Sequence, residues 1–413
     1  MTDLAQVFRD HHGRVLARLI SVLGDFDLAE DSLSDAYATA AAKWPANGVP
    51  ASPGGWLVTT ARRRAIDRIR RDRTYGEKVR LLAATPVTPA GADDEPVPDD
   101  RLLLFFACCH PALARTAQVA LTLRCLGGLS TAEVARLFLV PEATVSQRIV
   151  RAKAKIRDAG IPYRLPAAED LPARLPAVQA VIYLLFTEGH TATTGDRLIR
   201  AELCAEAIRL ARILHHLLPA EPEVPALLAL LLLTDARRAA RTDRDGRLVT
   251  LPEQDRDLWD RAQVAEGREL LVGALRSGAA GPYGLQAAIA AVHADAPAAE
   301  ATDWKQISGL YQLLATATAS PMVHLNHAIA VGMADGPAVG LRLLADLDAA
   351  GRLPHSHLTA VARADFLSKV DRAAEAAVAY EEAIAQAENT VERDFLIDRR
   401  DALLRSAPEG KNP

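Results

Sequence analysis

The stretch Leu129–Ile156 constrains the fold more than any other part of the chain. Ser130 is followed three residues later by Glu133, a capping box that starts a helix. The apolar pattern of this helix ends near Phe138, and Pro141 suits the first turn of a second helix. A helix, a tight turn and a second helix make a helix-turn-helix, whose second helix enters the major groove of DNA.

The second helix of this motif has two different faces. Its apolar residues recur at intervals of four, three and four, which places them on one side, facing a core: Val145, Ile149, Ala152 and Ile156. The neighbouring face carries donors that reach guanine edges and phosphates. The residues predicted to bind DNA are Thr144, Ser146, Gln147, Arg148, Arg151 and Lys155. The alternative is a solvated cationic helix that packs elsewhere in the fold.

A second basic segment precedes the motif. Arg62 to Arg80 contains nine basic and three acidic residues, a net charge of +6 in a chain whose net charge is −4. Arginine forms forks with phosphates and stacks on bases, so this segment is also predicted to contact nucleic acid. The predicted residues are Trp56, Arg62, Arg63, Arg64, Arg68, Arg70 and Arg71. A charge run that is only a solvated face is the alternative.

An acidic helix lies near the start of the chain. It carries Asp27, Glu30, Asp31 and Asp35 on one helical segment. Asp31 and Asp35 are four residues apart, a spacing at which like charges repel, and the helix dipole offsets that only near the helix start. A basic protein partner explains the cluster better than helix capping alone, although capping alone stays open.

The composition predicts a soluble, all-α protein. The 413 residues exceed one ordinary core, half of them are hydrophobic, and only 5% are aromatic. No run shows the alternation of a strand. The four cysteines lack disulfide or CxxC spacing, which suits a reducing cytoplasm. Asp3 and the amphipathic pattern that follows it lead us to expect no signal peptide at the beginning of the chain. The most apolar stretch, Val224 to Thr234, is too short to cross a bilayer.

Changes in composition divide the chain into five parts. Two helical domains are predicted at 4–75 and 101–160, joined by a proline-rich acidic linker at 76–100. A proline-rich joint at 161–176 precedes a helical-repeat solenoid at 177–408. Two helix-pair units near the end of the chain lie about 37 residues apart, slightly long for tetratricopeptide repeats. An irregular helix-pair solenoid is equally defensible.

No motif predicts catalysis or metal binding. Cys108-Cys109-His110 has no partner at ligand spacing, so we interpret the cysteines as a reduced core pair. Glu188-Gly-His190 is interpreted as a helix end. Two histidine pairs, His11-His12 and His215-His216, are interpreted as surface or boundary residues. There is no glycine-rich phosphate loop and no nucleophile elbow, so we expect no enzyme activity, no cofactor and no metal.

The order of these features resembles the sigma-70 superfamily, specifically the extracytoplasmic-function (ECF) sigma factors. Leu28-Ala-Glu-Asp-Ser-Leu-Ser-Asp-Ala-Tyr is similar to the family helix that docks on the clamp of the β′ subunit of core RNA polymerase. Trp56-Leu, Ala61-Arg62, Ile66-Asp67 and Arg70-Arg71 resemble the segment that melts and reads the −10 element. The helix-turn-helix corresponds to the domain that reads the −35 element. The stretch Asp170 to His190 resembles the signature of ECF sigma factors with a large tetratricopeptide-like extension.

The resemblance implies an alternative sigma factor made of a sigma-2 domain, a flexible linker, a sigma-4 domain and a regulatory solenoid. Its partners would be promoter DNA and core polymerase, through the β′ clamp and β subunits, with no membrane. The core-binding residues it implies are Asp27, Glu30, Asp31, Asp35 and Tyr37. We expect a monomer in the cytoplasm, with a small-molecule or protein effector of the solenoid.

Two other functions stay open. A conventional helix-turn-helix regulator with a solenoid sensor would act without joining the polymerase, as a dimer on palindromic sites. A peptide-binding scaffold with incidental basic helices would show no salt-dependent DNA binding.

Overall fold

The computed structural model describes residues 4–71, 101–125, 127–138, 140–161, 167–353 and 356–406. Within these ranges the chain is helical, and its only extended pairings are two isolated β-bridges, so the predicted all-α fold is confirmed. None of the described helices has the length and apolar character needed to span a membrane. The predicted linker 76–100 lies outside the described residues. The fold divides into two compact units, Met1–Leu184 and Leu185–Pro413.

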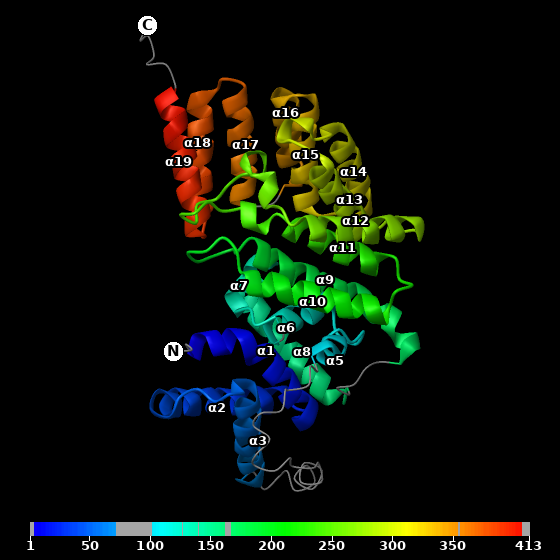
Figure 1. Ribbon diagram of the computed structural model, residues 1–413, viewed down its shortest axis with the longest axis vertical. Helices are drawn as coiled ribbons and strands as arrows, with labels where there is room; N and C mark the ends of the chain where they lie inside the picture. The colour runs from blue at the N-terminus through cyan, green and yellow to red at the C-terminus, as the bar shows by residue number, and fades with distance from the viewer. Residues whose placement is uncertain are drawn as a thin grey trace. The chain divides into compact units, whose positions relative to one another are not determined.

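Three helices at the start of the first unit pack against one another: α1 (Leu4–Leu23), α2 (Phe26–Asn47) and α3 (Pro53–Arg71) (Figure 1). Gly24 ends α1 with φ +66°, a left-handed conformation that glycine adopts without strain. Asp25 then caps α2, because its carboxylate accepts a hydrogen bond of 3.0 Å from the backbone N–H of Leu28.

The connection between α2 and α3 is short. The first helix runs to Asn47 with Pro45 inside it, and the second begins at Pro53. Proline is tolerated in the first turn of a helix because its missing N–H needs no partner there. The Ser52 hydroxyl accepts from the backbone N–H of Gly55 at 3.3 Å, which supports this early start.

Four further helices belong to the first unit: α5 (Arg101–Cys108), α6 (Arg115–Cys125), α7 (Thr131–Leu137) and α8 (Glu142–Asp158). Both α6 and α7 pack on α8, and α1 packs on α5. Cys108 and Cys109 are fully buried and reduced, so their interpretation as a core pair is confirmed.

The helix α9 (Leu171–His190) spans the boundary between the two units. Much of the predicted joint is helical, since a 3₁₀ turn precedes α9 and Pro176 lies inside the helix. Arg174 donates to the carbonyl of Phe106 at 2.8 Å, and Arg115 donates to that of Pro176 at 3.2 Å. The first turns of α9 therefore pack with α5 and α6. The predicted helix end at His190 is confirmed.

The second unit is built from helices that follow one another in antiparallel pairs. They are α10 (Ala201–Leu217), α11 (Glu223–Asp235), α12 (Arg261–Arg276), α13 (Pro282–Asp295), α14 (Trp304–Ala317), α15 (Pro321–Asp335), α16 (Pro337–Ala349), α17 (His357–Lys369), α18 (Ala373–Gln386) and α19 (Thr390–Ser406). Consecutive helices from α13 to α19 pack side by side (Figure 1), as in a helix-pair solenoid. The two predicted repeat units correspond to α15 with α16 and α17 with α18. The Tyr380 hydroxyl joins the second pair by donating to Asp365 at 2.6 Å.

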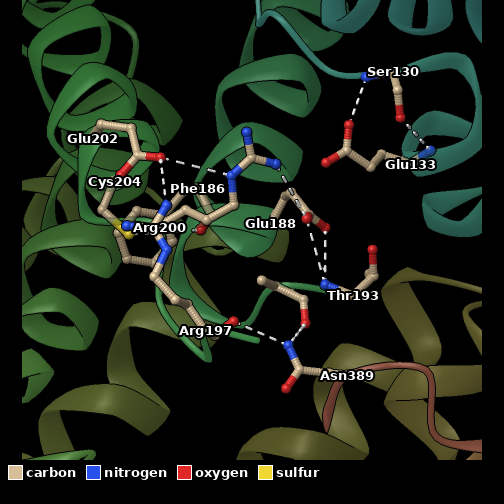
Figure 2. Close-up of polar contacts among 11 residues, drawn as sticks. Ser130, Glu133, Phe186, Glu188, Thr193, Arg197, Arg200, Glu202, Cys204 and Asn389 are labelled. Carbon is tan, nitrogen blue, oxygen red and sulfur yellow. Dashed lines mark hydrogen bonds and ion pairs between the residues drawn. The ribbon is translucent and has the colours of Figure 1, made fainter. Parts of the chain in front are cut away.

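A buried polar network holds the connection between α9 and α10. The amide of Asn389, which is fully buried, donates to the carbonyls of Ala192 at 2.9 Å and Arg197 at 3.0 Å (Figure 2). The carboxylate of Glu188 is 1% exposed and accepts from the backbone N–H of Thr193. Arg200 lies 3.5 Å from that carboxylate and provides the charge that a buried carboxylate requires.

Candidate polymerase and promoter surfaces

The helix-turn-helix forms as the sequence predicts. The Glu133 carboxylate accepts from the backbone N–H of Ser130 at 2.6 Å, and the Ser130 hydroxyl accepts from that of Glu133 at 3.2 Å (Figure 2). This capping box starts α7, which ends at Leu137. Pro141 caps α8 rather than lying within its first turn, which is a shift of one residue. The predicted core residues of α8 are all buried: Val145, Ile149, Ala152 and Ile156.

The residues predicted to read DNA from α8 are accessible. Four of them are exposed, Ser146, Gln147, Arg151 and Lys155, and two are half-buried, Thr144 and Arg148. They lie on the sides of α8 away from its buried stripe, which is the placement that contact with base edges requires.

The basic residues predicted on α3 are also largely accessible. Exposed guanidinium groups belong to Arg63, Arg64, Arg68 and Arg70, and Arg62 is half-buried. The side chain of Arg71 lies outside the described residues. Trp56 is half-buried, and its ring meets the edge of Trp44 at a centroid distance of 5.3 Å. Trp56 thus has a packing role in the free chain besides its predicted role in binding DNA.

The acidic residues of α2 lie along its accessible side. Asp27, Asp31 and Asp35 are exposed, and Glu30 is half-buried. Tyr37 is also half-buried and stacks on His12 with the ring centroids 6.0 Å apart. Burial raises the pKa of the Tyr37 phenol, so it stays neutral.

The structure brings α8 onto this acidic side of α2. The Lys153 ammonium lies 2.5 Å from Glu30 and 3.4 Å from Asp27. Arg157 reaches the other oxygen of Asp27 at 3.3 Å. The side chains of Lys153 and Glu30 are 13% and 29% exposed, so this pair is only weakly screened by solvent. Two of the predicted polymerase-binding acids are therefore paired with α8, the helix predicted to read DNA.

The environment of Lys153 keeps it charged. Burial lowers its pKa, but the Cys125 thiol and the carboxylates of Glu30 and Asp27 outweigh burial, so the pKa is raised overall. Burial raises the pKa of the Cys125 thiol to about 12. This thiol donates a hydrogen bond to the Glu30 carboxylate at 3.7 Å. Glu30 is therefore held by both α6 and α8.

A third acid of α2 is paired with α3. Arg68 lies 2.9 Å from Asp31, and both side chains are more than half exposed. An exposed pair of this kind contributes little to stability. No ion pair holds the Asp35 carboxylate within the part of the chain that the structure describes.

Sequence reasoning missed the roles of Lys153 and Arg157. Both belong to α8, but neither lies in its apolar stripe or in the predicted DNA-binding set. The available signal was their i,i+4 spacing on a third face of the helix. That signal identifies a cationic strip, but it does not identify the partner.

Three families match parts of this chain. Sigma-70 region 2 matches residues 7–74, and Sigma-70, region 4 matches residues 106–156. The Family of unknown function (DUF6596) matches residues 174–275. The first two matches cover the helices that carry the predicted −10 and −35 residues, and these families imply RNA polymerase and promoter DNA as partners.

Curated relatives agree with the family matches. "Uncharacterized protein R00370" of Rhizobium meliloti (strain 1021) is 41% identical over 396 residues, which cover 94% of this chain and 93% of that protein. "ECF RNA polymerase sigma factor SigK" of Mycobacterium ulcerans (strain Agy99) is 28% identical over 164 residues, or 38% of this chain and 85% of that protein. No solved structure matches this chain. The chain belongs to the ECF sigma factors of the sigma-70 superfamily and carries a large helical extension behind its two sigma domains.

Proposed function

We propose that this sigma factor binds core polymerase through α2, captures the single-stranded −10 element with α3 and reads the −35 element with α8. One observation carries the proposal: three helices within the two sigma-70 matches have accessible faces of different chemistry. The face of α2 is acidic, and those of α3 and α8 are basic. Exposed arginines on α3 suit the stacking and charge neutralisation of single-stranded DNA. Polar and basic residues beside the buried stripe of α8 suit the major groove.

The chain would act as a monomer on two unequal promoter elements and would catalyse nothing by itself. Polymerase would supply the chemistry and the work of promoter opening. A function as a conventional helix-turn-helix regulator would not account for the acidic side of α2 or for the arginines of α3. It would also pair two chains on a palindrome.

The free chain would be held closed by the contact between α8 and α2. Lys153 and Arg157 occupy the carboxylates of Glu30 and Asp27, the same groups that a basic polymerase surface would contact. Polymerase binding and this internal pairing would therefore compete. The helical extension would bias that competition, through a ligand or through a conformational change, in place of a separate inhibitor protein.

The proposal is tested by transcription in vitro with purified core polymerase and a genomic promoter library. The full chain is compared with a chain ending after His190, which retains the hydrogen bonds of α9 to α5 and α6. New start sites that share two spaced elements are the expected result. Starts with the shorter chain alone would mean that the extension inhibits, and starts with the full chain alone would mean that it is required. If neither the full chain nor the shorter chain produces new start sites, and neither binds polymerase, the conventional regulator would be favoured.

A further inference from the structure

The connection between α11 and α12 in the second unit contains several half-buried arginines, among them Arg237, Arg241 and Arg256. It contains a 3₁₀ turn at Arg238–Ala240 and another at Arg256–Leu258, and these two turns pack on each other. The backbone N–H of Asp260 donates to the carbonyl of Ala236 at 2.9 Å, which brings the end of the connection back to the end of α11.

Two of these arginines are anchored to backbone carbonyls at helix ends. Arg241 donates to the carbonyl of His190 and, at 2.9 Å, to the hydroxyl of Thr191. Arg256 donates at 2.9 Å to the carbonyls of His293 and Ala296. These contacts fix the two guanidinium groups, but no carboxylate among the residues that the structure describes is in direct contact with either of them.

Asp235, the acid at the end of α11, forms an ion pair with another arginine. Asp235 is 3% exposed, and one of its oxygens lies 2.6 Å from Arg238. It acts on Arg241 only at longer range, as does Glu392.

Arg237 differs from its neighbours. Among the described residues, no hydrogen bond or ion pair of its guanidinium group is seen, although the side chain is half-buried. Burial, followed by the positive charges of Arg241 and Arg256, lowers the pKa of Arg237 to about 10, and the phenol of Tyr311 acts in the opposite direction. Arg237 is still a cation at neutral pH, so the fold keeps a half-buried charge that is poorly compensated. Such a charge destabilises the fold unless an anion accompanies it.

Polar ring atoms beside Arg237 also lack partners. The positive charges of Arg237 and Arg256 act on the imidazole of His293. The His293 ring packs edge-on against Trp304, with the ring centroids 5.3 Å apart. Burial lowers the pKa of His293 to about 4, so the imidazole is neutral. Within the described part of the chain, its Nδ1 atom is buried without a hydrogen-bond partner, and the same holds for Nδ1 of His190. The buried indole of Trp259, which lies under the Arg256 guanidinium at 4.4 Å, has an Nε1–H without a partner.

We propose that Arg237, together with His293 and the anchored Arg241 and Arg256, binds the phosphate or carboxylate group of a small anionic molecule. Guanidinium forks match the oxygens of both groups. A neutral imidazole nitrogen can donate to the same anion, so an anion would supply an acceptor for both Arg237 and the Nδ1 atom of His293. Because Arg237 and His293 are half-buried, the site favours a small ligand over a macromolecular surface.

The test is thermal unfolding and calorimetric titration of the full chain in a zwitterionic buffer, with inorganic phosphate or citrate added at constant ionic strength. Saturable binding and a rise in the unfolding temperature are expected with at least one of the two. A response to phosphate identifies a phosphate-bearing ligand, and a response to citrate alone identifies a carboxylate. Arg237→Met should weaken the binding by about tenfold or more, because a charged hydrogen bond contributes at least that factor.

Two further variants separate binding from structure. Without anion, Arg237→Met should be as stable as the unchanged chain or more stable, because the substitution removes a poorly compensated charge. Arg237→Lys keeps the charge without the fork and should bind more weakly than the unchanged chain. The matched control is Arg372→Met on α18, an exposed arginine paired with Glu375, which should keep the full response. The site is disproved by no saturable response to either anion, or by an equal response in Arg237→Met, since both anions also stabilise proteins non-specifically.

Discussion

The ammonium group of Lys153 lies 2.5 Å from the carboxylate of Glu30, so α8, the helix proposed to read the −35 element, is joined to α2, the helix proposed to bind polymerase. The two residues are 123 positions apart in the chain. Because a carboxylate that is paired with a lysine is less available to a basic partner, this pair links the two binding activities.

Replacing Lys153 with glutamine should strengthen binding to core polymerase by roughly fivefold, since about 1 kcal/mol of internal pairing no longer competes. Equilibrium binding to core enzyme, measured at low and moderate salt, checks this. Lys155→Gln is the control, because this exposed lysine of α8 lies in the predicted DNA face. It should leave polymerase binding unchanged. Weaker polymerase binding by the Lys153 variant would mean that Lys153 itself contacts the polymerase.

Reversing the charges of Asp31 and Asp35 to lysine should weaken polymerase binding while the fold survives. Both residues are exposed, and the Asp31 pair with Arg68 is solvent-screened, so the loss of stability should be below about 1 kcal/mol. Pull-down with core enzyme and thermal unfolding measure the two effects separately. Glu169→Lys, an exposed acid outside α2, should bind normally. Unchanged binding by the double variant would place the docking face elsewhere.

Replacing Arg148 and Arg151 with alanine should reduce the preference for the correct −35 sequence, since each good base contact contributes about 1–3 kcal/mol. Transcription from promoters with single −35 substitutions measures that preference. Val150→Ala is the matched control, because this residue of α8 is 63% exposed and lies outside the predicted reading set. The assignment of α8 as recognition helix fails if the arginine variant still distinguishes the substituted promoters.

The close packing of Gly332 against Phe366 should make Gly332→Ala destabilising by about 1–3 kcal/mol. A Cβ at residue 332 would lie 2.2 Å from the ring, and the ring is buried. Gly309→Ala on α14 is the control, since its Cβ would meet no atom and alanine favours a helix by roughly 0.5–1 kcal/mol. Denaturant unfolding of the full chain compares them. Adding Phe366→Leu should recover part of the stability lost in Gly332→Ala.

Acidification should destabilise the second unit through His293. The pKa of this imidazole falls from 6.5 to about 4 on folding, because burial and the nearby arginines disfavour its charged form. Between these two values the unfolded chain binds a proton that the folded chain does not, so stability decreases as the pH falls. The expected loss is on the order of 1–3 kcal/mol between pH 7 and pH 4. His293→Asn should flatten this dependence in denaturant titrations, whereas the exposed His216→Asn should not.

Local signals in the sequence determined much of this molecule. The capping box of Ser130 with Glu133, the proline at 141 and the apolar spacing of α8 act within a few residues of one another, so the helix-turn-helix followed from them. The break at Gly24 and the helix end at His190 are equally local. The proline-rich joint predicted at 161–176 is partly helical, because Pro176 lies inside α9. Proline excludes only some helix positions, and flanking residues decide the rest.

Tertiary structure alone decided which charges meet. Nothing near Lys153 in the sequence indicates Glu30, because the pair depends on how α8 packs against α2. The isolation of Arg237 depends likewise on Asp235 pairing with Arg238 and on the carbonyls that hold Arg241 and Arg256. A sequence pattern reports which face of a helix is polar. The partner of that face, and the burial that sets the strength of each charge, arise only when distant segments pack together.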